Sequence, residues 1–198
     1  MAFGGSEPVS DTTVVPTSVK IVVAGGFGVG KTTMVNSVSE IPPLRTEEVL
    51  TEASVGVDDM RLVEGKETTT VALDFGRITI NQNVVLYLFG TPGQNRFWFM
   101  WDELAHGALG AIVLVDTRRL DSSFPSIDFF ERRHIPFVVA VNNFDGAWQH
   151  TVDEVRSALD IDPSIPIVQC DARERESGKE VLVQLVQYTM DQLATASA

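Results

Sequence analysis

The chain has 198 residues, of which 44% are hydrophobic and 21% charged, and its formal net charge is −12. This length and composition predict one soluble globular domain with its own hydrophobic core. The negative charge argues against DNA, RNA or anionic lipid as a partner, because binding to phosphate backbones or headgroups needs a basic surface.

The two ends and the single cysteine indicate where such a protein works. The N-terminus lacks the basic start and apolar stretch of a signal peptide, and neither end carries a lipidation motif. The apolar runs are too short to span a bilayer. Cys170 is the only cysteine in the sequence, which suits a reducing compartment. We therefore expect a cytoplasmic protein with no direct membrane anchor, which could be recruited to a membrane only by partners.

Residues 1–17 mix Gly, Ser, Pro and Thr and predict a flexible leader, residues 18–192 a single domain, and residues 193–198 a disordered tail. In the domain, short β-branched runs alternate with helical patterns. This alternation predicts an α/β fold with a six-stranded, mostly parallel sheet and helices on both faces. The expected strands are residues 19–24, 69–80, 84–89, 111–116, 137–142 and 165–169. The expected helices are residues 31–38, 94–105, 124–133, 151–159 and 178–192.

Residues 81–83 read Asn-Gln-Asn and predict a tight turn, which would make the flanking strands one antiparallel hairpin. Residues 40–67 are harder to assign. A Glu-Gly-Lys stretch at 64–66 suggests a small extra hairpin over residues 57–63.

Residues 25–32 read Gly-Gly-Phe-Gly-Val-Gly-Lys-Thr and match the phosphate-binding P-loop pattern. Glycines allow backbone N–H groups to converge on phosphate oxygens, Lys31 supplies charge for the β- and γ-phosphates, and Thr32 supplies a hydroxyl for Mg²⁺. The alternative is a chance match in a glycine-rich turn. The apolar strand before the motif and the helix after it favour a nucleotide site. The residues expected to bind the nucleotide here are Gly25, Gly28, Val29, Gly30, Lys31, Thr32 and Thr33.

A second loop follows the expected strand at 137–142 and reads Asn142-Asn143-Phe144-Asp145. A carboxylate at Asp145 can accept hydrogen bonds from guanine N1–H and the 2-amino group. Adenine has no donor at either position, so it would leave that carboxylate unpaired. The alternative is a strand-end asparagine and a helix-capping aspartate, which are common in α/β loops.

This loop resembles the N-K-x-D guanine box of Ras-like GTPases, with Asn143 at the position of the family's lysine, which ties the base loop to the P-loop. Asp171, Ala172 and Arg173 resemble the S-A-K loop, whose backbone N–H contacts guanine O6. Together the motifs resemble a small GTPase over about residues 18–192. The resemblance implies binding of GTP and GDP with Mg²⁺.

The segments at 70–76, 88–94 and 113–119 narrow the resemblance to the actinobacterial conservon GTPases, which are relatives of the MglA-like GTPases of gliding motility. That narrower resemblance implies a partner of the roadblock/LC7 type and a membrane protein resembling a sensor histidine kinase.

The third strand lacks an expected carboxylate. Small GTPases carry D-x-x-G there, and this chain reads Gly90-Thr91-Pro92-Gly93. Gly93 remains as the expected sensor of the γ-phosphate. If the hairpin is centred on Gln82, Asp74 faces Gly90 across the two strands, on the same face. In the family, that Asp holds Mg²⁺ through water, and we hypothesise that Asp74 supplies the missing carboxylate from the neighbouring strand. The alternative is a surface aspartate without a role.

The remaining expectations concern the two switch segments of such a protein. Ser54 is the favoured switch I ligand for Mg²⁺, with Thr51 as its competitor, because an uncharged oxygen can join the metal shell while the γ-phosphate is present. Gln94 is placed to orient the attacking water. Arg96 and Arg45 are candidates for stabilising transition-state charge, with solvated surface charge as the alternative.

The sequence thus predicts a molecular switch that hydrolyses GTP slowly. A guanine-nucleotide scaffold with negligible hydrolysis and an ATP-using P-loop enzyme are the rival interpretations.

Overall fold

The computed structural model describes residues 15–42, 44–50, 69–93 and 99–196. Its strands are β1 (Thr17–Gly25), β2 (Leu44–Leu50), β3 (Thr69–Asn81), β4 (Val84–Gly90), β5 (Gly110–Val115), β6 (Phe137–Asn142) and β7 (Ile167–Cys170). Its helices are α1 (Lys31–Val38), α2 (Phe99–Ala105), the 3₁₀ helix η2 (Thr117–Ser123), α3 (Phe124–Arg132), α4 (Val152–Leu159) and α5 (Arg175–Ala196).

The strands form one sheet in the order β2-β3-β4-β1-β5-β6-β7. The pairs β2–β3 and β3–β4 are antiparallel, and every other pair is parallel. The predicted α/β class and mostly parallel sheet are confirmed. Two details of the prediction were wrong: the sheet has a seventh strand, β2, and β3 therefore lies in two antiparallel pairs rather than one. The polar composition of Leu44–Leu50 lacks the apolar run by which the other strands were recognised.

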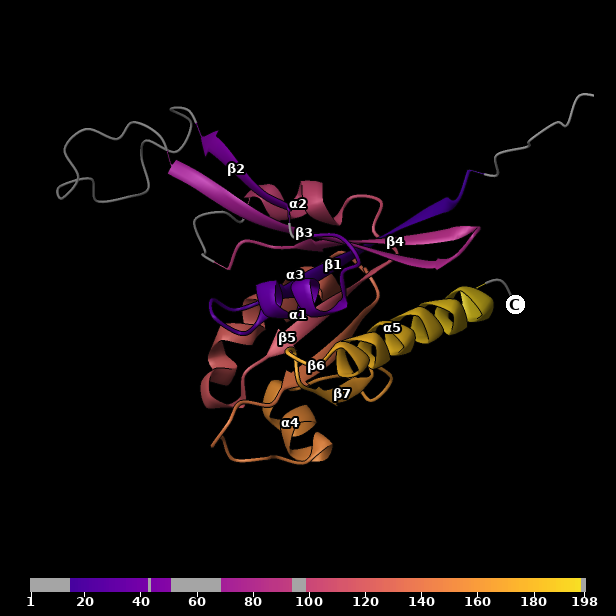
Figure 1. Cartoon of the computed structure of the whole chain (residues 1–198). Helices are drawn as coiled ribbons and strands as arrows, with labels where there is room; N and C mark the ends of the chain where they lie inside the picture. The colour runs from indigo at the N-terminus through magenta and orange to yellow at the C-terminus, as the bar shows by residue number, and fades with distance from the viewer. Residues whose placement is uncertain (1–14, 43, 51–68, 94–98, 197–198) are drawn as a thin grey trace, which may run out of the picture.

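Helices cover both faces of the sheet (Figure 1). One core cluster joins α1 and α5 to residues such as Ile21 and Val23, and a second joins α2, α3 and α4 to Val22 and Ala24. Adjacent residues of β1 therefore enter opposite cores, which explains why the central strands are continuous apolar runs. This arrangement places the loop after β1 at the carboxyl edge of the sheet, where α/β proteins bind ligands.

The hairpin register is the one expected. Asp74 pairs with Gly90, and the same register continues to Thr79 and Val85 before a shift at the turn. α5 begins three residues earlier than predicted and continues to Ala196, through residues that had been assigned to the tail. The helix η2 was not predicted at all. The extra hairpin over 57–63 lies outside the described residues.

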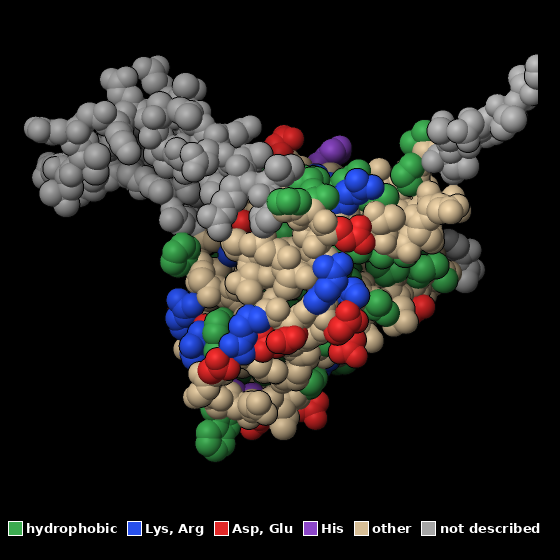
Figure 2. Space-filling view, viewed as in Figure 1, with side chains coloured by type: hydrophobic (Ala, Val, Ile, Leu, Met, Phe, Trp, Pro, Cys, Tyr) green, Lys and Arg blue, Asp and Glu red, His purple; other side chains and the backbone are tan. Residues whose placement is uncertain are grey.

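Acidic and basic side chains are intermixed on the face shown in Figure 2. Of the helices in the described ranges, none has the length and hydropathy needed to span a bilayer.

Candidate functional site

The loop between β1 and α1 has the conformation that its glycines predict. Gly25, Gly28 and Gly30 all have positive φ. Two features exclude a side chain at Gly30. Its φ is 106°, and an added Cβ would lie 2.6 Å from Nδ2 of Asn142. The loop therefore turns tightly onto the start of α1, where the helix N-terminus favours an anion.

Lys31 is folded back over this loop. Its side-chain amine donates to the carbonyl oxygens of Gly25 at 2.8 Å and Gly26 at 2.7 Å. Burial lowers the pKa of Lys31 to about 8, and the nearby charge of Asp74 opposes that shift. Among the described residues the hydrogen bonds of Lys31 go to carbonyl oxygens, and a buried ammonium of this kind gains from a phosphate, because an anion compensates its lost hydration.

Thr32 and Asp74 meet beside the loop, although they lie 42 residues apart in the chain. The Thr32 hydroxyl donates to Oδ2 of Asp74 at 2.5 Å. The carboxylate needs the space over Gly90, because a Cβ there would lie 3.1 Å from Oδ2 and 3.0 Å from Cβ of Asp74. A hydroxyl and a carboxylate are the oxygen ligands that Mg²⁺ accepts next to phosphates. The residues present therefore fit this ion. No cluster of three His, Cys, Asp or Glu residues in the described part of the chain could hold a metal by itself.

Gly93 lies against the P-loop. A Cβ at this position would be 2.7 Å from Nζ of Lys31 and 2.9 Å from Cα of Phe27. The preceding Thr91 is fixed by its N–H, which donates to Val23 O at 2.9 Å. The end of β4 thus brings the expected γ-phosphate sensor next to the phosphate loop, and only a glycine fits there.

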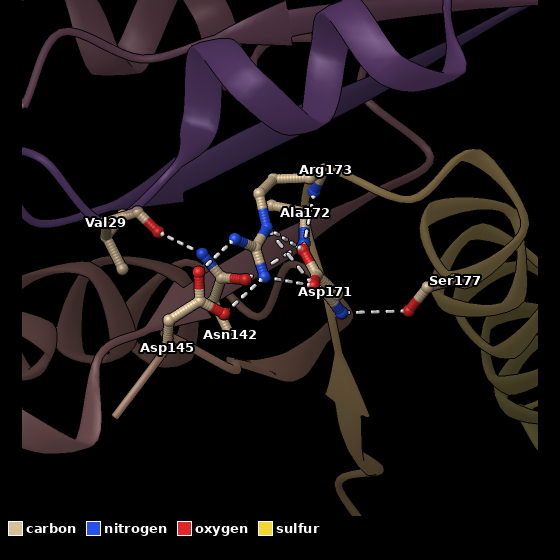
Figure 3. A network of polar contacts seen from close by, with 7 residues as sticks. All are labelled: Val29, Asn142, Asp145, Asp171, Ala172, Arg173 and Ser177. Atoms are coloured by element: carbon tan, nitrogen blue, oxygen red, sulfur yellow. Dashed lines mark hydrogen bonds and ion pairs between the residues drawn. The ribbon is translucent and has the colours of Figure 1, made fainter. Parts of the chain in front are cut away.

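Asn142 joins three segments of the site (Figure 3). Its Nδ2 donates to Val29 O at 3.0 Å, and its Oδ1 accepts from the N–H of Ala172 at 2.9 Å. Asn142 is buried, so both of these bonds are protected from water. The phosphate loop, the loop after β6 and the loop after β7 are held in one arrangement by this side chain.

Asp145 lies beyond Asn142 and is 85% exposed, but it has a partner. The guanidinium of Arg173 donates to both of its oxygens and also to Asp171. These bonds hold the pKa of Asp145 below its usual range, with the side-chain hydrogen bond from Arg173 as the main cause. The backbone N–H of Asn143 donates to the carbonyl oxygen of Cys170 at 2.7 Å.

The N–H groups of the loop after β7 already have partners inside the protein. The N–H of Ala172 is donated to Asn142, and the N–H of Arg173 is donated to Oδ1 of Asp171 at 2.9 Å. The contact with guanine O6 that the S-A-K resemblance implies is therefore not preformed here.

A second group of charged residues borders the P-loop, and the sequence interpretation gave it no role. Asp116 is fully buried at the end of β5 and accepts two side-chain bonds at 2.9 Å from Arg118. Arg119 donates to the carbonyl of Phe27 at 3.2 Å, and Arg118 lies over the ring of Phe144. The sequence signal available for this group was an aspartate directly after a buried strand. In the structure, Asp116 caps η2 by accepting a hydrogen bond from the N–H of Arg118.

Several expected residues are not part of this geometry. Gln94, Arg96, Ser54 and Thr51 lie outside the described residues, as does the side chain of Arg45. Thr33 is described and exposed, next to Thr32 at the start of α1. The described residues that gather at the carboxyl edge of the sheet are Gly25, Gly28, Val29, Gly30, Lys31, Thr32, Asp74, Gly93, Asn142, Asp145 and Ala172.

A family model described as "Conserved hypothetical ATP binding protein" matches residues 23–192. The match covers most of the chain, from β1 to α5, so the chain belongs to this family.

Relatives of the chain include an uncharacterized protein of Methanocaldococcus jannaschii, 32% identical over 129 residues, which are 64% of this chain and 71% of that protein. The Ras-related protein Rab-7b of Paramecium octaurelia is 30% identical over 149 residues, 70% of this chain and 64% of the relative. A probable translation initiation factor IF-2 of Thermofilum pendens is 25% identical over 181 residues, which cover 28% of that much longer chain.

Solved structures with the same fold include the G domains of the FeoB iron transporters. That of T. maritima matches with a TM-score of 0.59 and 20% identity, over 87% of this chain and 99% of that one. That of Methanococcus jannaschii matches with a TM-score of 0.58 and 16% identity, over 87% and 98%. The fold of this chain is therefore that of a Ras-like P-loop G domain.

Proposed function

We propose that this member of the P-loop family binds GTP and GDP with Mg²⁺ and acts as a nucleotide-dependent switch that hydrolyses GTP slowly. The observation that carries the proposal is the bridge at Asn142, which ties the phosphate loop to the loops after β6 and β7. A nucleotide needs a phosphate site at one end and a base site at the other, and this bridge fixes the two sites relative to each other.

The choice of guanine rests on Asp145. A carboxylate accepts from guanine N1–H and from the 2-amino group, whereas adenine offers no donor in that position. Asp145 is ionised at neutral pH, as an ordinary aspartate is, and Arg173 lowers its pKa further. The likeness to a Ras-related protein and to G domains supports the same choice.

Thr32 and Asp74 would hold Mg²⁺ together with the phosphates. When bound, the ion neutralises charge on the β- and γ-phosphates. Asp74 takes the place of the aspartate that β4 lacks, since it reaches the Thr32 hydroxyl from the neighbouring strand. Ser54 is our candidate for the remaining protein ligand, supplied by switch I.

Hydrolysis itself depends on residues of the second switch. Gln94 follows Gly93 and would orient the attacking water, and Arg96 would stabilise transition-state charge. We propose that Mg²⁺–GTP orders residues 41–58 and 90–105, and that hydrolysis releases them. A scaffold that binds guanine nucleotide without hydrolysis differs from this only in turnover.

A second candidate is an ATP-binding protein, which the description of the matching family favours. The P-loop, Lys31 and Thr32 serve either nucleotide equally well, because they bind phosphates. Asp145 is the residue that separates the two proposals.

The narrower assignment to the conservon GTPases, with a roadblock/LC7-type partner and a sensor-kinase-like membrane protein that recruits the chain from the cytoplasm, stays a proposal. It rests on the resemblance of the segments at 70–76, 88–94 and 113–119.

Two measurements on the purified full chain test the proposed function. Copurifying nucleotide is released by denaturation and identified, and phosphate release from GTP is then followed over hours. We expect GDP or GTP in the wild type, none with Lys31→Ala, and an unchanged content in the control variant Asp191→Asn, which alters an exposed residue of α5. Adenine nucleotide in the wild type would overturn the assignment, and GTP binding with no release of phosphate would favour the scaffold.

A further inference from the structure

Arg173 is hydrogen-bonded to Asp145, the carboxylate that the proposed function assigns to guanine. Its Nη1 donates to Oδ2 of Asp145 at 2.7 Å and its Nη2 to Oδ1 at 3.0 Å (Figure 3). The guanidinium therefore engages both oxygens of Asp145 side by side, as bidentate arginine–carboxylate pairs do.

Guanine offers the same pattern of donors along one edge. Its N1–H and its 2-amino group present two nearly parallel N–H bonds to one carboxylate. Two ligands with that pattern cannot use the same two-oxygen site together, because their donors would occupy the same positions. We propose that Arg173 competes with guanine for Asp145 and so sets the affinity of the base site. The inference rests on the proposed function.

Asp171 gives the displaced arginine a second partner. Nε of Arg173 lies 2.9 Å from Oδ1 of Asp171 and 3.2 Å from Oδ2, and Nη2 lies 2.7 Å from Oδ2. The backbone on both sides is also fixed, since Asp171 Oδ1 accepts from the N–H of Arg173 and Ser177 Oγ accepts from the N–H of Asp171. Arg173 can therefore leave Asp145 and remain paired with Asp171.

The competition is modest in size, because the contested pair is exposed. The side chain of Asp145 is 85% exposed and that of Arg173 53%. Exposed ion pairs of this kind contribute little, so removing the competitor tightens guanine-nucleotide binding by about two- to fivefold. The direction is what distinguishes this role from a supporting one, since an arginine that helps to hold the base would weaken binding when removed.

The test is the dissociation constant of GDP, measured with the full chain and GDP carrying a fluorescent N-methylanthraniloyl group on the ribose. Arg173→Ala and Arg173→Gln should both bind more tightly than the wild type. Arg132→Ala is the matched control, because Arg132 makes an exposed pair with Asp128 in α3, away from the site. The gain should shrink as salt is added, since salt screens the contested ion pair.

Asp171→Asn provides a second, independent readout. Asparagine keeps the oxygen that accepts from the backbone of Arg173 but removes the charge that anchors its guanidinium. Arg173 is then left with Asp145 alone, so GDP binding should weaken, and the same change in an Arg173→Ala background should have no effect.

The outcomes distinguish failure of the proposed function from failure of the competition at Asp145. If the wild type does not bind GDP, or if Asp145→Asn binds it as tightly as the wild type, the proposed function fails. If the wild type binds GDP and both arginine variants bind it equally or more weakly, only the competition is overturned. Circular dichroism confirms that each variant is folded.

Discussion

Thr32 at the start of α1 and Asp74 on β3 form a hydrogen bond of 2.5 Å between two segments that are far apart in the sequence. The bond exists because β3 and β4 pair in a register that sets Asp74 opposite Gly90, and Gly90 leaves room for the carboxylate. A carboxylate missing from one strand is thus available from its neighbour.

Asp74→Ala should weaken Mg²⁺-dependent binding of GDP by about 10–100-fold, the usual effect of removing a supporting group at a metal site. The measurement is the GDP dissociation constant with Mg²⁺ and again with EDTA. The loss should appear with Mg²⁺ and be small without it. Asp191→Ala is the control, and equal affinities for Asp74→Ala and the wild type in Mg²⁺ would exclude a role for Asp74.

Gly90→Ala should have a related effect without touching a charge. The added Cβ would lie 3.1 Å from Oδ2 of Asp74, so the Asp74 side chain has to shift, which disturbs its hydrogen bond with Thr32. We expect weaker Mg²⁺-dependent binding and a loss of about 1–3 kcal/mol in the free energy of unfolding. Ile80→Ala, at an exposed position near the other end of β3, is the control in urea denaturation. Unchanged nucleotide binding in Gly90→Ala would show that the space over Gly90 is unimportant.

The affinity for GDP should depend on pH through Lys31. The pKa of its amine is about 8 in the free protein, because burial disfavours the charge. Phosphate favours the charged form and therefore raises this pKa in the complex. Affinity should be constant below pH 8 and fall above it by up to about tenfold per pH unit.

Titration calorimetry at pH 7 to 9 checks this dependence. Lys31→Arg is the matched variant, since arginine stays charged throughout and should give a flat profile, whatever its absolute affinity. A wild-type profile as flat as that of the arginine variant would contradict the role of Lys31 burial.

Cys170 should be unreactive in the folded chain. Burial, together with the negative charge of Asp171, raises the pKa of its thiol to about 12, so almost no thiolate is present at neutral pH. Iodoacetamide should label the native protein slowly and the urea-unfolded protein fully, with mass spectrometry as the readout. Rapid labelling without denaturant would show that the end of β7 opens readily.

The parts of the fold that the sequence predicted are those with strong local patterns. The continuous apolar runs of β1 and β6 and the glycine-rich loop before α1 depend on short stretches, and the structure confirms them. The pairing of Asp74 with Gly90 was predicted from a turn centred on Gln82. The turn itself pairs Asn81 with Val84, and the register shift between Asn81 and Thr79 brings the strands into the predicted pairing.

The features that were missed depend on distant contacts. β2 is polar and becomes a strand by pairing with β3. The pairing of Arg173 with Asp145 spans 28 residues and two loops, and no local pattern announces it. The buried Asp116 looked like an ordinary strand end until η2 placed Arg118 and Arg119 around it.

The proposed preference for guanine over adenine depends on Asp145. Competition between unlabelled GTP and ATP for the site, against fluorescent GDP in the presence of Mg²⁺, tests it directly in the wild type and in Asp145→Asn. We predict that GTP displaces the probe from the wild type at far lower concentrations than ATP, and that Asp145→Asn loses most of this preference. Equal displacement by ATP and GTP in the wild type, or a preference that survives in Asp145→Asn, would contradict it.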